Sequence, residues 1–299
     1  MTKDRLLVFD LLRILAIILV LCGHIPSLGI RIGITDSYVI PFFGSLLISR
    51  EGVILFIFIS GAMLEYNKKN LSDLTSLVSF YIDKIIRIYP AYLASLAFAA
   101  CFFSTIIMKQ SPWDIVSEIL GISGFTQVPL MSINPVGWFI GLLVVLYLLY
   151  PLLSSLIERN PELWMIALVG FSLICRAIFW TYNEPGSIVN NYWYGNPLSN
   201  LGFFTLGIYV IRRKLYPAWT HSNKGITWLS ELTFYIFLIQ SPIIVYGVWD
   251  LSPILFVVCT LTVAAMLMAF DREMQSCLRR WINRSLHLDK KILIKSAVL

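Results

Sequence analysis

The stretch FDLLRILAIILVLCGH, residues 9–24, is a long apolar run that nevertheless contains an aspartate, an arginine and a histidine. It belongs to the apolar segment 6–28, which can cross a bilayer as a helix because a crossing needs about 20 apolar residues. Arg13 and His24 are 11 positions apart. At about 100° per residue, this spacing puts both side chains on one helix face, about 16 Å apart along the axis.

Ionisable side chains in a spanning helix normally face protein or a water-filled cavity, because contact with lipid costs several kcal/mol. Asp10 precedes Arg13 by three residues, so the two can form an ion pair on the same helix. An alternative interpretation is that Asp10 and Arg13 reach the inner headgroups and His24 the outer interface. The alignment of Arg13 with His24 favours one polar face that runs through the membrane.

The whole chain has the composition of a membrane protein. Hydrophobic residues make up 58% and charged residues 13%, and the mean hydropathy is +0.78, far from an average soluble domain. Residues 114–131 look interfacial or re-entrant. We therefore expect an all-α integral membrane protein, a bundle of about eight and up to ten transmembrane helices. The predicted spans are residues 6–28, 41–65, 88–108, 137–157, 163–181, 198–211, 226–247 and 251–270.

The distribution of lysine and arginine predicts the orientation. With the N-terminus in the cytoplasm, most of the 23 basic residues fall in cytoplasmic loops and the tail, as the positive-inside rule requires. Both termini are then cytoplasmic, in a multi-pass protein of a bacterial or archaeal inner or plasma membrane. A single transmembrane domain, 1–270, is followed by a basic tail, 271–299, with the pattern of a surface amphipathic helix. The net charge of +6 indicates contact with anionic lipid and no nucleic-acid partner.

Metal and disulfide chemistry are not expected. Five cysteines are scattered without C-x-x-C spacing, and such cysteines in apolar runs normally pack as small hydrophobic residues. No cluster of His, Cys and Asp has the spacing of metal ligands. No tightly bound cofactor is therefore predicted.

The pattern D-x-x-R-x-x-A-x-x-x-V-x-x-x-H, read from Asp10 to His24, resembles the first helix of the membrane acyltransferase-3 family. The hallmark of that family is Arg or Lys, ten residues, then His. Its members move acyl groups, commonly acetyl from acetyl-CoA, onto hydroxyls of cell-surface carbohydrates. The resemblance thus implies an O-acyltransferase with acyl-CoA as donor substrate and a carbohydrate as acceptor.

Three further stretches resemble the family in the same order, and together the resemblance covers about residues 6–270. ILFIFISGAML resembles its second helix, which ends in Ser-Gly; in this chain these two residues are Ser60 and Gly61. YIDKIIRIYPAY resembles a basic stretch, here with Lys84 and Arg87. GWFIGLLVVLYLLYPLL, which begins near Trp138, resembles a helix that ends in Tyr-Pro.

Two features depart from the family pattern. The family usually has about ten spans, whereas eight are predicted here. Its late helix often carries a histidine where SELTFYIFLIQSPII has Gln240, and glutamine can hydrogen-bond but cannot accept a proton at neutral pH.

The predicted chemistry centres on His24 as general base, because acyl transfer to a hydroxyl needs a group that accepts its proton near neutral pH. Arg13 would organise the donor. Lys84 and Arg87, an i, i+3 pair, would hold the CoA phosphates, although positive-inside anchoring would select the same residues. The donor would enter from the cytoplasm and the acceptor from the outer side.

Other polar and aromatic residues are possible supports of this site. Ser60 beside Gly61 is first a small-residue packing position and second a lining for the CoA arm. Trp138 suits a membrane interface or stacking on a sugar. Arg176, in the middle of a span, needs a protein partner or a substrate anion.

A transporter of a small anion or sugar intermediate is the alternative function. Its pathway would be lined by Arg13, His24, Arg50 and Arg176. The ordered motifs and the lack of inverted repeats or paired broken helices favour the enzyme.

Overall fold

The computed structural model describes residues 5–31, 46–68, 71, 73–102, 110–126, 132–182, 195–217, 219–220, 223–246 and 253–285. Within these ranges, the side chains of residues 24–31, 46–49, 244–246, 253, 283 and 285 are not described. The described part of the chain is helical apart from turns and one isolated bridge between Leu6 and Thr220. The all-α prediction is therefore confirmed.

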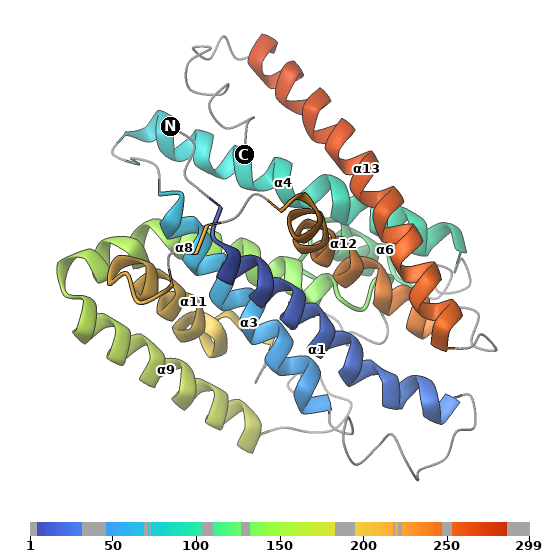
Figure 1. The fold of residues 1–299 in the computed structure, drawn as a ribbon, viewed down its shortest axis with the longest axis horizontal. Helices are drawn as coiled ribbons and strands as arrows, with labels where there is room; N and C mark the ends of the chain where they lie inside the picture. The colour runs from blue at the N-terminus through green and yellow to red at the C-terminus, as the bar shows by residue number, and fades with distance from the viewer. Residues whose placement is uncertain are drawn as a thin grey trace.

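Eight long helices and two short ones make up the described fold (Figure 1). The short helices, α6 (Pro112–Ile119) and α7 (Ser123–Thr126), lie in the segment predicted to be interfacial or re-entrant. Within the described residues, each predicted span overlaps one long helix. The long helices are α1 (Leu7–Arg31), α3 (Leu46–Tyr66), α4 (Leu74–Phe102), α8 (Gly137–Arg159), α9 (Pro161–Thr181), α11 (Pro197–Arg212), α12 (Lys224–Tyr246) and α13 (Pro253–Ser285).

Length and apolarity identify this chain as a multi-pass membrane protein. Among the described residues, four helices are long and apolar enough to cross a membrane, namely α4, α8, α9 and the segment Ile254–Ile282 of α13. The remaining crossings and the side of the membrane on which the termini lie stay predictions. α13 runs without a break through residue 270, so residues 271–285 continue the last long helix.

The first residues of α9 and α11 show why these helices begin where they do. Asn160 and Asn196 are the N-caps, and their side chains accept hydrogen bonds from the backbone N–H groups of Leu163 and Leu198. A proline follows each asparagine, at the first helical position. Asparagine satisfies an N–H that the helix leaves free, and proline has no N–H to lose there.

The long helices pack in a definite order. α3 lies between α1 and α11, and α9 covers the other side of α11; α12 packs against α1, α4 and α13. Phe56 of α3, Phe139 of α8 and Phe237 of α12 meet at the centre, with ring centroids 4.7–6.5 Å apart. This aromatic contact joins α3, α8 and α12.

α3 and α11 approach unusually closely because a glycine of each helix faces the backbone of the other. A Cβ atom on Gly61 would overlap the carbonyl oxygen of Phe204, and one on Gly207 would overlap that of Phe58. Small residues allow such backbone contact between membrane helices. The packing interpretation of Ser60-Gly61 is therefore supported at Gly61.

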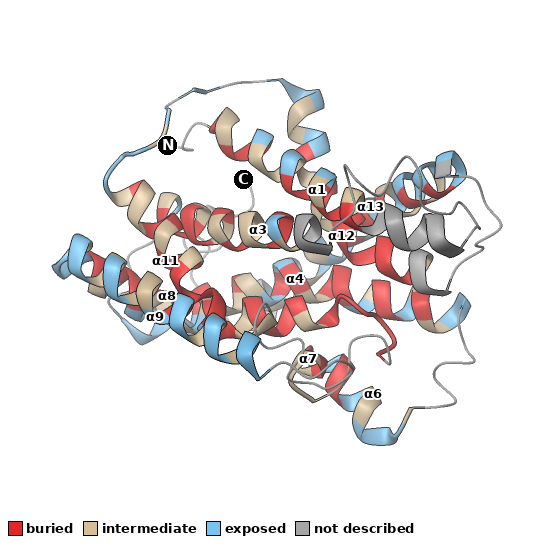
Figure 2. Ribbon diagram, turned by 90° about the horizontal axis from the view of Figure 1, so that it is seen from below, coloured by how far each residue is buried: buried red, intermediate tan, exposed pale blue. Residues whose placement is uncertain are grey.

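α9 lies at the periphery of the bundle. Ser172 is the one buried residue of this fully described helix, and Figure 2 shows exposed residues along its length. Its exposed side chains are largely apolar, such as Leu163, Ile166 and Ile174. A long apolar helix with so little protein cover suits contact with lipid.

Candidate active site

The first turns of α1 are anchored by a buried carboxylate. Asp10 is 1% exposed and accepts hydrogen bonds from Arg13 Nη1 at 3.0 Å, Ser230 Oγ at 2.7 Å and Arg5 Nε at 2.6 Å. The predicted ion pair of Asp10 with Arg13 is thus present. These charge-assisted hydrogen bonds compensate the cost of burying the carboxylate and hold the Arg13 side chain.

The same network ties three helices together. Arg5 also donates to Glu231 of α12 at 2.8 Å, and Arg272 of α13 donates to the other oxygen of Glu231 at 2.6 Å. Burial opposes the positive charge of Arg5, but its bonds to Asp10 and Glu231 prevail and raise its pKa above the usual value. Arg5 therefore stays a fixed cation at the start of α1.

Arg13 and Arg87 lie close enough for their positive charges to repel each other, although they come from α1 and α4. Arg87 is exposed and forms no ion pair within the described part of the chain. Its charge also acts on Asp271 and Tyr235, and the Tyr235 hydroxyl donates to Asp271 at 2.6 Å. An anion would relieve the repulsion between these two charges.

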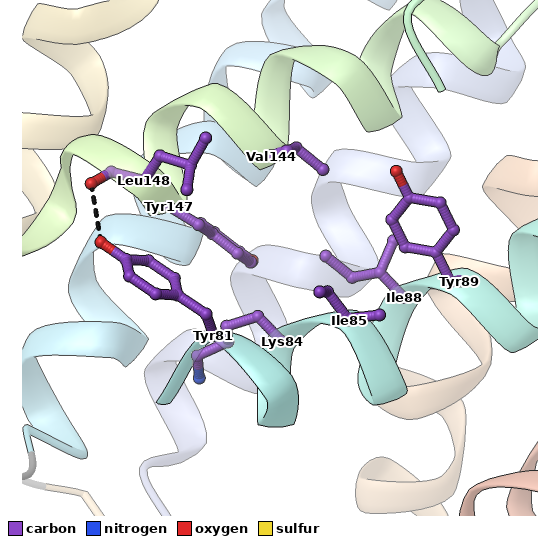
Figure 3. Close-up of a pocket in the computed structure, with 8 residues that line it drawn as sticks. All are labelled: Tyr81, Lys84, Ile85, Ile88, Tyr89, Val144, Tyr147 and Leu148. Atoms are coloured by element: carbon purple, nitrogen blue, oxygen red, sulfur yellow. Dashed lines mark hydrogen bonds between the residues drawn. The ribbon is translucent and has the colours of Figure 1, made fainter. Parts of the chain in front are cut away.

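Lys84 lies three residues before Arg87 on α4, so the two are neighbours on the helix surface. Its side chain lines a hollow between α4 and α8 (Figure 3), and Nζ is 5.0 Å from the ring centroid of Phe80. The charge of Arg87 also acts on Asp271 of α13 and Tyr235 of α12. Lys84 thus borders α8, and the charge of Arg87 reaches α12 and α13.

The predicted base lies on the second half of α1. The helix is continuous from Leu7 to Arg31, so the backbone positions of Arg13 and His24 keep the predicted register on one face. The His24 side chain lies outside the described part of the structure. Its catalytic role stays a prediction.

Gln240 and Trp138 occupy the ends of α12 and α8 that lie away from Arg13. Gln240 is fully buried, and neither its side-chain oxygen nor its nitrogen has a hydrogen-bond partner among the described atoms. Trp138 is half-buried and packs against Gly124 and Gly195. Ser60 of α3 is half-buried.

Arg176 has the protein partner that its position in a span requires. Its Nη2 donates to Asn200 Oδ1 at 3.1 Å, and its guanidinium carbon lies 5.0 Å from the ring centroid of Phe203. Both partners belong to α11. The charges of Arg50 and Glu51 on α3 also act on it. Arg176 thus has polar and aromatic contacts within the protein, and it also lines a hollow with Leu173 and Trp180.

The acyltransferase domain of the acyltransferase 3 family matches residues 6–284. The chain belongs to the acyltransferase 3 family. No curated protein and no solved structure matches the chain. Family membership makes the protein a membrane acyltransferase, and the match includes all the helices that carry the site.

Two buried polar residues of this acyltransferase were not singled out from its sequence. Glu118 of α6 is fully buried, and its Oε1 accepts from the Ile133 N–H at 2.9 Å. Asn134 is also fully buried and donates from Nδ2 to Ser95 Oγ at 3.0 Å and to the Leu238 carbonyl at 3.1 Å. Together they fix segment 132–137, which leads into Trp138.

One sequence signal could have indicated the role of Asn134. Pro242 has no N–H, so the Leu238 carbonyl, four residues earlier, loses its helical donor. A buried carbonyl of this kind needs a partner from elsewhere in the protein. Asn134 of the acyltransferase provides it.

Proposed function

We propose that this acyltransferase moves an acyl group, most simply acetyl, from acyl-CoA to a hydroxyl of a cell-surface carbohydrate such as a polysaccharide, an O-antigen or an exopolysaccharide. The observation that carries the proposal is that the charges of Arg13 on α1 and Arg87 on α4 act on each other, while Asp10 holds Arg13. Phosphate groups of CoA match two such guanidinium groups in charge. Lys84, expected from the sequence as a further donor contact, would act from the neighbouring face of α4.

In the proposed reaction, His24 removes the proton from the acceptor hydroxyl as its oxygen attacks the thioester carbonyl carbon. The new C–O bond replaces the C–S bond, and the CoA thiolate takes the proton back from the imidazolium. Arg13 lies about 16 Å from His24 along α1 by helix geometry. The donor would therefore lie along the polar face of α1, with its phosphates at the end where α1 begins.

The transport alternative is not favoured. It required Arg13, His24, Arg50 and Arg176 to line one pathway, but Arg176 is held by Asn200 and Phe203. Asn200 thus provides the protein partner that was the alternative to a substrate anion. Family membership also supports transfer chemistry.

The experiment separates donor binding from transfer. Purified protein is incubated with labelled acetyl-CoA and carbohydrate acceptors, and acetyl-CoA binding is measured in parallel. His24→Ala should abolish transfer and preserve donor binding. Arg87→Gln should weaken donor binding at least tenfold, as expected for a lost charge-assisted contact.

Lys224→Gln provides the control, because Lys224 is an exposed cation at the first residue of α12. This variant should bind acetyl-CoA as the unmodified protein does. Full transfer by His24→Ala at normal abundance would refute the assignment of the base. Unchanged donor binding by Arg87→Gln would refute the phosphate site.

A further inference from the structure

A shallow apolar hollow of about 80 Å³ lies between α4 and α8 (Figure 3). Five residues of α4, from Tyr81 to Tyr89, and three of α8, from Val144 to Leu148, line it. The lining residues of α4 extend over about 12 Å along the helix axis. The hollow is open to the outside of the bundle, where Ile85 and Leu148 are both 55% exposed.

The walls of this groove are held in place by hydrogen bonds to the backbone. The Tyr81 hydroxyl donates to the Leu148 carbonyl at 3.1 Å, and the Tyr89 hydroxyl donates to the Leu120 carbonyl at 2.8 Å. Both phenol groups are therefore engaged with protein, and the rings present apolar surface to the groove. Such a preformed apolar groove lowers the cost of binding an apolar chain.

The groove has one cation and no acid among its lining residues. Lys84 is that cation, and the nearest acid in sequence, Asp83, pairs with Arg279 of α13 at 2.8 Å. The predicted hydrocarbon span of α4 begins at residue 88, so Lys84 lies about one turn outside it, whereas Ile88 and Tyr89 lie within it. With that predicted limit, a cation at headgroup depth adjoins the end of the groove at Ile88 and Tyr89, which lies at hydrocarbon depth.

We propose that this groove binds an anionic glycerophospholipid. The lipid phosphate contacts the Lys84 ammonium group, and one acyl chain lies in the hollow between α4 and α8. Attraction of anionic headgroups to a lysine near the membrane surface contributes about 1 kcal/mol, or about fivefold in affinity. The bound chain would fill the gap between the two helices and support the segment of α4 that carries Arg87. The site does not depend on the acyl-transfer reaction.

The test measures lipid retention by the purified full-length protein with native mass spectrometry. Phosphatidylglycerol and phosphatidylcholine with identical acyl chains are titrated separately. The unmodified protein should retain phosphatidylglycerol about fivefold better. Lys84→Gln should remove that preference, and Val144→Phe, which fills the hollow, should weaken retention of both lipids.

Two variants control for general effects on the surface. Lys224→Gln removes an exposed cation away from the groove, and Leu152→Phe enlarges an exposed side chain of α8 outside it. Both should retain lipid as the unmodified protein does, and thermal unfolding in detergent checks that all four variants are folded. An unchanged preference in Lys84→Gln, or unchanged retention in folded Val144→Phe, would overturn the proposal.

Acetyl-CoA binding distinguishes this site from the donor site. Acetyl-CoA binding by Lys84→Gln is therefore measured beside its lipid retention. If the variant loses acetyl-CoA affinity and keeps its preference for phosphatidylglycerol, Lys84 serves the donor and the lipid site is refuted. Loss of the transfer reaction in His24→Ala bears on the proposed function alone.

Discussion

Glu118 shows how one side chain can make the fold sensitive to pH. It lies on α6, which has eight residues and is too short to cross the membrane. Its Oε1 accepts from the Ile133 N–H, whereas Oε2 is buried with no hydrogen-bond partner among the described atoms. Burial raises the pKa of Glu118 from its usual 4.5 to about 7. The protonated form is therefore the one that this site favours.

The consequence for stability has a definite sign. Between about pH 4.5 and pH 7 the folded state keeps a proton on Glu118 that the unfolded state has released, so stability falls as the pH rises. We expect the unmodified protein to unfold at a lower temperature at pH 8 than at pH 5. The free energy of unfolding should differ between the two pH values by up to about 3 kcal/mol because of Glu118. Glu118→Gln should remove this contribution, and thermal unfolding in detergent at both pH values measures the change.

A matched control removes an acid that is already in water. Glu273 is exposed on α13, so Glu273→Gln should keep the pH dependence of the unmodified protein. If Glu118→Gln also keeps it, the carboxyl of Glu118 is not the group responsible.

Local and long-range contacts differ in how far the sequence reveals them. The pair of Asp10 with Arg13 was predictable, because residues three apart are neighbours on any helix. Ser230 and Arg5, which complete the same cluster, could not be assigned to it, since their approach depends on the packing of α12 and the entry to α1. The burial of Glu118 likewise depends on segment 132–137, which is distant in sequence.

At the scale of elements, α12 depends on a hydrogen bond from outside the helix. Pro242 provides no N–H for the Leu238 carbonyl, and Asn134 donates to that carbonyl instead at 3.1 Å. Asn134→Ala should therefore destabilise the protein by about 1–3 kcal/mol, because a buried carbonyl and Ser95 lose their partner. Equilibrium unfolding in detergent measures the change.

A double-mutant cycle tests the cause. Pro242→Ala restores an N–H four residues after Leu238, so Asn134→Ala should cost less in the Pro242→Ala background. Equal costs in both backgrounds would show that the Leu238 carbonyl does not carry the effect.

The contact between α3 and α11 makes a prediction that contrasts two glycines. A Cβ on Gly61 would overlap the Phe204 backbone, whereas a Cβ on Gly170 of α9 would meet nothing within 4 Å. Gly61→Ala should force the helices apart and destabilise the protein by about 1–3 kcal/mol. Gly170→Ala should be neutral or stabilise it by about 0.5–1 kcal/mol. Thermal unfolding of both variants in one detergent tests the pair, and equal effects would contradict the close approach.

Hydropathy located the long helices but not their ends. The third predicted span begins at residue 88, yet α4 begins at Leu74, and α13 continues past residue 270. These extensions carry charges that pair with each other, as Asp83 does with Arg279. A hydropathy pattern ends at such charges, whereas the helices continue because their partners satisfy them.

At the scale of the whole molecule, basic residues gather at the end of the bundle where α1 begins, and several are paired there. Arg212 of α11 bonds to Glu65 and to Glu158, and Lys68 bonds to Glu158 at 2.8 Å. Tyr150 also donates to the buried Glu65 at 3.0 Å. This end is therefore a network between helices as well as a positive surface. Positive charge at one end of a membrane protein predicts which side faces the cytoplasm.

Cysteine labelling in sealed membrane vesicles of known orientation tests that prediction. In a cysteine-free background, Asn67→Cys places a thiol after α3 and Lys214→Cys places one after α11, both at the basic end, while Tyr182→Cys lies beyond the other end of α9. All three positions are exposed. A maleimide that cannot cross membranes should label the first two from the cytoplasmic side and the third from the opposite side. If Asn67→Cys and Tyr182→Cys are labelled from the same side, the predicted number of crossings between α3 and the end of α9 is refuted. If each of the three is labelled from the side opposite to the one expected, the proposed CoA site lies outside the cell, where acyl-CoA cannot reach it.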